Sequence, residues 1–179
     1  MSIQSVAVFC GSKPGKNIAF IEAAKQLGML LAKHNISLVY GGGSVGIMGT
    51  IADSVLENKG TVIGVIPQVL VAWEQQHKGI TTLHIVNDMH ERKRIMYELC
   101  DAAIILPGGY GTLDEMFEII TWNNLKIHEK KIVLVNIDGF YDALITHIDT
   151  MQKQGFLYEN WKERIVLVDT IDAIFSFFY

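Results

Sequence analysis

Two glycine-rich segments carry the residue types that could hold a phosphate group. The first runs from Gly41 to Gly49 and the second from Pro107 to Glu115. Each follows a short apolar run and leads into a pattern typical of a helix. Glycine lets backbone N–H groups approach an anion closely, and a helix N-terminus favours negative charge. The two segments therefore predict one crevice that binds an anion and a sugar, although a tight turn without a ligand also explains the first.

The first segment has the spacing Gly41-x-Gly43-x-x-Gly46 of a dinucleotide-binding turn. That pattern alone is weakly specific. The acidic residue that would bind the ribose of NAD is expected at the end of the next strand, where Pro67 stands. The segment also lacks the Lys-Ser/Thr ending of a P-loop. We therefore do not expect NAD to bind.

A third segment, Met89 to Met96, is dense in charged residues. Arg92 lies three positions after Met89 and four before Met96, which places it on the apolar stripe of a helix. An arginine directed at apolar surroundings needs an anionic partner. That partner is either a carboxylate such as Glu115 or a ligand phosphate. Lys93 borders the same face, and a solvated charged face is the alternative explanation for the run.

Glu115 has a structural explanation beside a chemical one. Thr112-x-x-Glu115 has the spacing of a capping box, and acidic residues are favoured in the first turn of a helix. A carboxylate at a helix start that faces a site can also act on a substrate. The two roles are compatible.

Short apolar runs alternate with helical patterns along the chain. The predicted strands are Ser5–Phe9, Ser37–Tyr40, Thr61–Ile66, Leu83–Val86, Ala102–Leu106, Ile132–Asn136 and Ile165–Val168. The predicted helices are a segment capped by Asn17 that ends near Lys33, then Gly46–Asn58, Met89–Cys100, Thr112–Leu125, Phe140–Gln154 and Thr170–Phe177.

This alternation predicts an α/β fold with a doubly wound parallel sheet in a three-layer αβα sandwich, built as a single Rossmann-like domain over residues 1–179. Ligands of such folds bind outside the carboxyl ends of the strands. Ser12, Gly42 and Gly43 follow strands and are therefore candidate binding residues. The connection from Pro67 to Ile80 is longer than the others and predicts either a wall of the site or a solvated excursion.

The composition excludes several classes of protein. Half of the 179 residues are apolar and the formal net charge is −4, which disfavours nonspecific binding to nucleic acid. Cys10 and Cys100 have no metal-type spacing, so we expect two buried, inert thiols and no metal site. There is no signal-peptide pattern and no apolar run long enough for a membrane span, so the expected compartment is the cytoplasm.

The three segments together closely resemble the LONELY GUY (LOG) family. The resemblance rests on Gly41–Gly49, on Met89-His90-Glu91-Arg92-Lys93 and on Pro107-Gly108-Gly109-x-Gly111-Thr112-x-x-Glu115, and it covers nearly the whole chain. The family is a Rossmann-like α/β sandwich and is usually dimeric. Its activity is that of a cytokinin riboside 5′-monophosphate phosphoribohydrolase, which releases free base and ribose 5-phosphate. Bacterial members often accept AMP.

The resemblance implies catalytic roles for Arg92 and Glu115. It implies that the substrate is a nucleoside monophosphate and that the protein is a homodimer. For the hydrolysis itself we expect no metal or organic cofactor to be needed. Glu74 falls where the family has an acidic residue in contact with the substrate. The remaining implied substrate-binding residues are Lys93, Gly109, Tyr110, Gly111, Thr112 and Thr121.

Members of this family have often been labelled lysine decarboxylases. That activity requires a lysine that holds pyridoxal phosphate. His77-Lys78 is the only His-Lys pair, and the preceding Gln75-Gln76 lacks the usual upstream serine, so we reject the label. Two alternatives stay open, namely a nucleotide-binding sensor or carrier without catalysis, and a transferase that uses another acceptor in place of water.

Overall fold

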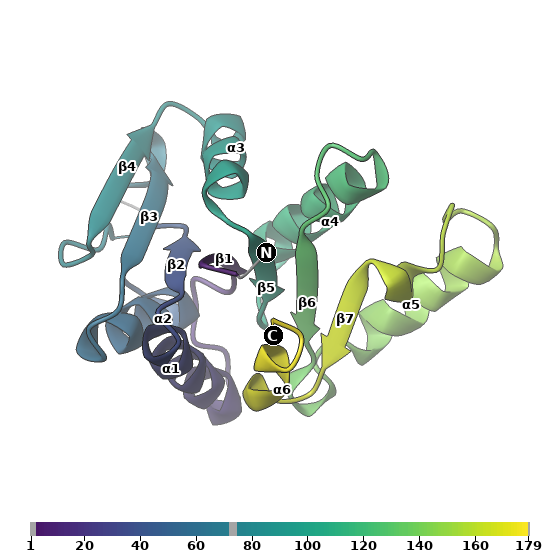
Figure 1. The fold of residues 1–179 in the computed structure, drawn as a ribbon, viewed down its shortest axis with the longest axis horizontal. Coiled ribbons are helices and arrows are strands. Elements are labelled where there is room, and N and C mark those ends of the chain that lie inside the picture. The colour runs from purple at the N-terminus through teal and green to yellow at the C-terminus, as the bar shows by residue number, and fades with distance from the viewer. Residues whose placement is uncertain (1–2, 72–74, 179) are drawn as a thin grey trace.

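The computed structural model describes residues 3–71 and 75–178. Seven strands form one sheet in the order β4-β3-β2-β1-β5-β6-β7 (Figure 1). Every neighbouring pair is parallel. The strands are β1 Ser5–Phe9, β2 Ser37–Tyr40, β3 Val62–Pro67, β4 Thr82–Val86, β5 Ala102–Ile105, β6 Lys131–Val135 and β7 Ile165–Val168.

Helices cover both faces of this sheet. One core cluster joins the sheet to α1, α2 and α6, and the other joins it to α3, α4 and α5. Figure 1 shows α1, α2 and α6 below the sheet, with α3 and α4 above it. The α-helices are α1 Ile18–Lys33, α2 Gly46–Glu57, α3 Met89–Leu99, α4 Tyr110–Asn124, α5 Asp142–Lys153 and α6 Ile171–Phe175. The predicted three-layer doubly wound class is confirmed.

All predicted strands and helices are present, and their ends differ from the predictions by at most two residues. Asn17 caps α1 as predicted, because its side chain accepts a hydrogen bond from the Ala19 amide at 3.0 Å. The start of α5 was predicted too early. Tyr141 is the N-cap, and its φ and ψ angles of −100° and 8° lie outside the helical region, so the helix begins at Asp142.

The strand order places a topological switch point between β1 and β5. The chain winds outward from β1 toward β4 on one side and from β5 toward β7 on the other. A crevice opens at such a point, outside the carboxyl ends of the two central strands. The loops that follow β1 and β5 meet there, since the Gly11 amide donates to the Pro107 carbonyl at 3.0 Å.

Candidate active site

A cavity of about 370 Å³ lies at this switch point. The loop after β1 contributes Cys10, Gly11 and Ser12 to its wall, and the start of α4 contributes Gly109, Tyr110, Gly111 and Thr112. Two buried charged residues, Arg92 from α3 and Glu115 from α4, complete the polar part of the lining. The structure therefore brings together seven of the residues that the sequence analysis singled out.

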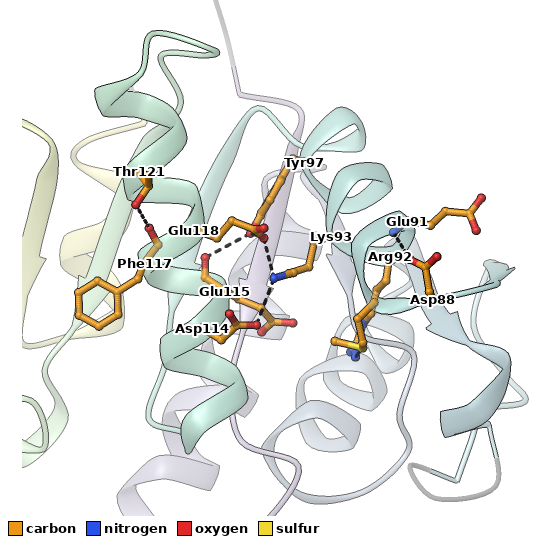
Figure 2. A network of polar contacts seen from close by, with 11 residues as sticks. Asp88, Glu91, Arg92, Lys93, Tyr97, Asp114, Glu115, Phe117, Glu118 and Thr121 are labelled. Carbon is orange, nitrogen blue, oxygen red and sulfur yellow. Dashed lines mark hydrogen bonds and ion pairs between the residues drawn. The ribbon is translucent and has the colours of Figure 1, made fainter.

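Arg92 is held in the cavity by the way α3 begins. Asp88 caps the helix, and its carboxylate accepts a hydrogen bond from the Glu91 amide at 2.8 Å (Figure 2). One residue later Arg92 is 4 % exposed. Its guanidinium lies against Gly41, where an added Cβ would stand 1.8 Å from Nη2. The absent side chain of Gly41 thus provides the space that the guanidinium occupies.

Glu115 approaches the same cavity from the neighbouring helix. It lies on α4, is 8 % exposed, and belongs to the same side of the sheet as Arg92, because α3 and α4 cover one face. The predicted convergence of a cation from one helix and an acid from the next is therefore present. A carboxylate that shares a cavity with a cation can serve as a base or stabilise a positive charge.

The predicted capping box at Thr112 is wrong. Helix α4 begins at Tyr110 with Gly109 as its N-cap, and no side chain caps it. Thr112 packs back over the preceding turn, where its Oγ1 is 2.1 Å from the position that a Cβ on Gly108 would take. The earlier start directs the first turn of α4 at the cavity. The first N–H groups of a helix have no acceptor within the helix, so this turn suits an anion.

Lys93 and Thr121 do not line this cavity. The Lys93 ammonium is paired with Glu118 at 3.0 Å and with Asp114 at 3.2 Å (Figure 2). Burial alone would lower the pKa of Lys93, but the two carboxylates outweigh it and raise this pKa. Thr121 donates to the Phe117 carbonyl at 2.7 Å and lines a separate cavity of about 240 Å³ between α4 and α5. Their substrate-binding roles stay predictions.

Gly42 and Gly43 face another segment of the chain. The His77 amide donates to the Gly42 carbonyl at 2.9 Å, and Gly43 forms an antiparallel bridge with Gln76. The first glycine-rich segment therefore contributes to the cavity in two ways. Gly41 makes room for Arg92, and the start of α2 forms part of the wall. Glu74 lies outside the described residues, and its role stays a prediction.

One wall of the cavity is apolar and was not predicted from the sequence. Met48 from α2, Leu70 from the short turn after β3 and Met89 from α3 form it. Nothing in the periodicity distinguishes these three side chains from core residues. Leu70 belongs to the long connection after Pro67, so part of that connection is a wall of the site. Cys10 is buried as expected, yet it too lines the cavity.

Two absences bear on cofactors and membranes, and both concern the described residues 3–71 and 75–178. No group of three or more His, Cys, Asp or Glu residues there could hold a metal ion. No helix in this part of the chain is long and apolar enough to cross a bilayer.

The family described as "Possible lysine decarboxylase" matches residues 48–177. The chain is 43 % identical over 171 residues to the cytokinin riboside 5′-monophosphate phosphoribohydrolase of Rhodococcoides fascians, covering 95 % of this chain and 86 % of that protein. It is 47 % identical over 165 residues to the probable cytokinin riboside 5′-monophosphate phosphoribohydrolase LOGL1 of Oryza sativa subsp. japonica, covering 92 % and 74 %.

Among solved structures, the molybdenum cofactor binding protein from Rippkaea orientalis is similar in fold. The TM-score is 0.74 at 19 % identity, and the match covers 99 % of this chain and 96 % of that one. At such low identity the likeness concerns the fold alone.

Proposed function

The chain belongs to the LONELY GUY (LOG) family, and we propose that it hydrolyses the base–ribose bond of a nucleoside 5′-monophosphate. The products are the free base and ribose 5-phosphate. Cytokinin riboside 5′-monophosphates and AMP are the substrates to consider first. The reaction class follows from relatives that carry this activity in their names and match the chain over more than nine-tenths of its length.

One observation of the structure supports the proposal above all others. Arg92 and Glu115 are buried in the same cavity, next to the first turn of α4. Cleavage of an N-glycosidic bond passes through a state in which the ribose carries positive charge. The reaction needs a carboxylate beside that charge, an activated water and a fixed 5′-phosphate. In the lining, Glu115 can act on the charge and the water, and the first turn of α4 can bind the phosphate.

In the proposed mechanism Glu115 stabilises the developing cation and takes a proton from the attacking water. The water oxygen forms a bond to the anomeric carbon while the bond to the base nitrogen breaks, and the leaving base takes up the proton that Glu115 removed from the water. Arg92 keeps Glu115 ionised and orients it or a substrate oxygen. Amides of Gly109 and Gly111 and the hydroxyl of Thr112 bind the phosphate. These steps require no metal or organic cofactor.

The cavity does not fit pyridoxal phosphate, which a decarboxylase would need. None of the described residues that line it is a lysine. Lys93 is engaged by two carboxylates on α4, and Lys78 is exposed on another surface. The cavity therefore lacks a lysine that could form a Schiff base with the cofactor, and its lining residues favour hydrolysis over decarboxylation.

We also propose a cytoplasmic homodimer that binds neither nucleic acid nor a membrane. The negative net charge supports the absence of a nucleic-acid partner. Exposed apolar residues on and just after α4, among them Phe117, Leu125 and Ile127, support a contact between two copies. Light scattering of the purified protein tests this part, and a monomer at micromolar concentration would contradict it.

The decisive experiment follows base release from a panel of nucleoside 5′-monophosphates and the matching nucleosides without phosphate. We expect adenine from AMP, or the modified base from an isopentenyl-adenosine monophosphate, and little release from nucleosides. Glu115→Gln removes the proposed base, so turnover should fall roughly 10³-fold while the fold is kept. The matched control is Glu98→Gln, which lies on the exposed side of α3 paired with Arg94. Tight binding of AMP without base release would favour the carrier alternative.

A further inference from the structure

We infer that Tyr97 and Glu118 are positioning residues that fix the Glu115 backbone of α4 against α3. This inference rests on the proposed function, because it assigns the two residues to the alignment of Glu115 with Arg92. Neither Tyr97 nor Glu118 lines the cavity. Their effect on catalysis must therefore pass through the helices that carry the catalytic pair.

The Tyr97 hydroxyl joins the two helices. It lies 2.9 Å from Oε2 of Glu118 and 3.3 Å from the backbone carbonyl oxygen of Glu115. Its single hydrogen is shared between these acceptors. Figure 2 shows the hydroxyl between the two helices, above the Glu115 side chain. A residue of α3 thus contacts the backbone of the proposed catalytic acid directly.

Lys93 makes a second contact between α3 and α4, at the Glu118 carboxylate. Its ammonium pairs with Glu118 at 3.0 Å, on the same Oε2 atom that the Tyr97 hydroxyl approaches. Lys93 and Tyr97 are four residues apart and share one side of α3. Glu118 therefore accepts from two donors on the neighbouring helix, and its side chain is 22 % exposed.

The ring of Tyr97 cannot easily move away from this position. Tyr97 is 2 % exposed, and its ring packs edge-on against Phe9 of β1 and Trp122 of α4, with centroids 6.0 Å and 5.1 Å apart. Burial raises the pKa of Tyr97, and the negative charge of Glu118 raises it further, so the hydroxyl keeps its proton. It is a permanent hydrogen-bond donor held by the core.

The register of the helices explains why this contact bears on the catalytic pair. Arg92 precedes Lys93 on α3, and Glu115 precedes Glu118 by one turn on α4. The two cavity residues and the contacts among Tyr97, Lys93 and Glu118 therefore lie on the same two helices, about one turn apart. A shift of α4 that lengthens the contacts of Glu118 with Tyr97 and Lys93 also moves Glu115. Displacements on the order of 1 Å can cost about a hundredfold in rate.

Tyr97→Phe tests the inference, because it removes the hydroxyl and keeps the ring. We expect kcat to fall at least tenfold, while KM stays within threefold, since no group in the cavity is lost. Glu118→Gln is the second variant, and it removes the charge while leaving an oxygen that can accept from Tyr97. It should lose less activity than Glu118→Ala, which removes the acceptor.

A control separates positioning from general stability. Ile174→Val trims a fully buried residue of α6, on the opposite face of the sheet, and should lower the melting temperature without lowering kcat. The inference is overturned if Tyr97→Phe and Glu118→Ala both keep kcat within twofold, or if they raise KM alone. It is also overturned if Ile174→Val lowers the melting temperature as much as Tyr97→Phe does and loses as much kcat. Failure of the unaltered protein to release base would instead contradict the proposed function.

Discussion

The Arg92 guanidinium occupies the place where a side chain on Gly41 would stand. A Cβ on Gly41 would lie 1.8 Å from Nη2 and 3.1 Å from Cζ of Arg92. Gly41 is the first residue after β2, and Arg92 is in the second turn of α3. A glycine that resembles part of a nucleotide-binding turn therefore makes room for a charged side chain of the protein itself.

Gly41→Ala should displace Arg92 and leave the fold in place, since the clashing atom is the far end of a flexible side chain. We expect base release to fall by about tenfold or more. Gly79→Ala is the matched control, because its added Cβ would meet only His77 at an ordinary 3.4 Å. Steady-state kinetics with circular dichroism check both. Equal activity of the two variants would show that the position of Arg92 does not matter.

Arg92→Ala removes the cation from the cavity, where Glu115 is also buried. We expect kcat/KM to fall by about 10²–10³-fold, because a preorganised charge in a cavity shielded from water is difficult to replace. Arg92→Lys should recover only part of the loss, since an ammonium lacks the planar fork of a guanidinium. A loss below tenfold for Arg92→Ala would identify a purely structural arginine.

Ligands should protect the Cys10 thiol, which lines the cavity. In a Cys100→Ala background, saturating AMP should slow alkylation of Cys10 at least fivefold when Glu115→Gln prevents turnover. Mass spectrometry of the alkylated protein measures this rate. Adenosine, which lacks the phosphate, is the matched control and should protect less. Equal rates with and without AMP would place the ligand elsewhere.

Cys100 should behave differently, because burial raises its pKa to about 11. A thiol whose folded-state pKa is raised stays neutral at pH values where an unfolded cysteine, with a pKa of about 8.5, is already ionised. In a Cys10→Ser background, alkylation at pH 8.5 should be at least a hundredfold slower in the native protein than in urea, and it should keep rising as the pH approaches 11. A native rate that levels off near pH 9 would contradict this.

Much of the fold could be read from the sequence. The continuous apolar runs, such as Val133-Leu134-Val135, predicted strands that are buried on both faces, and the alternation with helices predicted the parallel sheet. Their ends were less well defined, because backbone turns decide where a helix begins. At Thr112 the capping pattern is present in the sequence, yet α4 begins earlier, at Tyr110.

The burial of Arg92 could be predicted from the sequence, because a charged side chain on an apolar helical stripe must meet a partner. The catalytic role of Glu115 was expected only from the family resemblance, since the sequence pattern by itself indicated a capping box. The periodicity of α3 did not say which neighbour each buried residue meets. Arg92 and Lys93 are both buried, but the first faces the cavity and the second faces α4.

By itself, the sequence determined the class of fold and the burial of Arg92, since these follow from local pattern and residue type, and the resemblance of its motifs indicated the family. Only the tertiary structure decided which residues share a cavity. It separated Thr121, Gly42 and Gly43 from that cavity and added Met48, Leu70 and Met89 to its wall. The physical reason is that such neighbours come from distant parts of the chain, and the packing of helices on the sheet sets their distances.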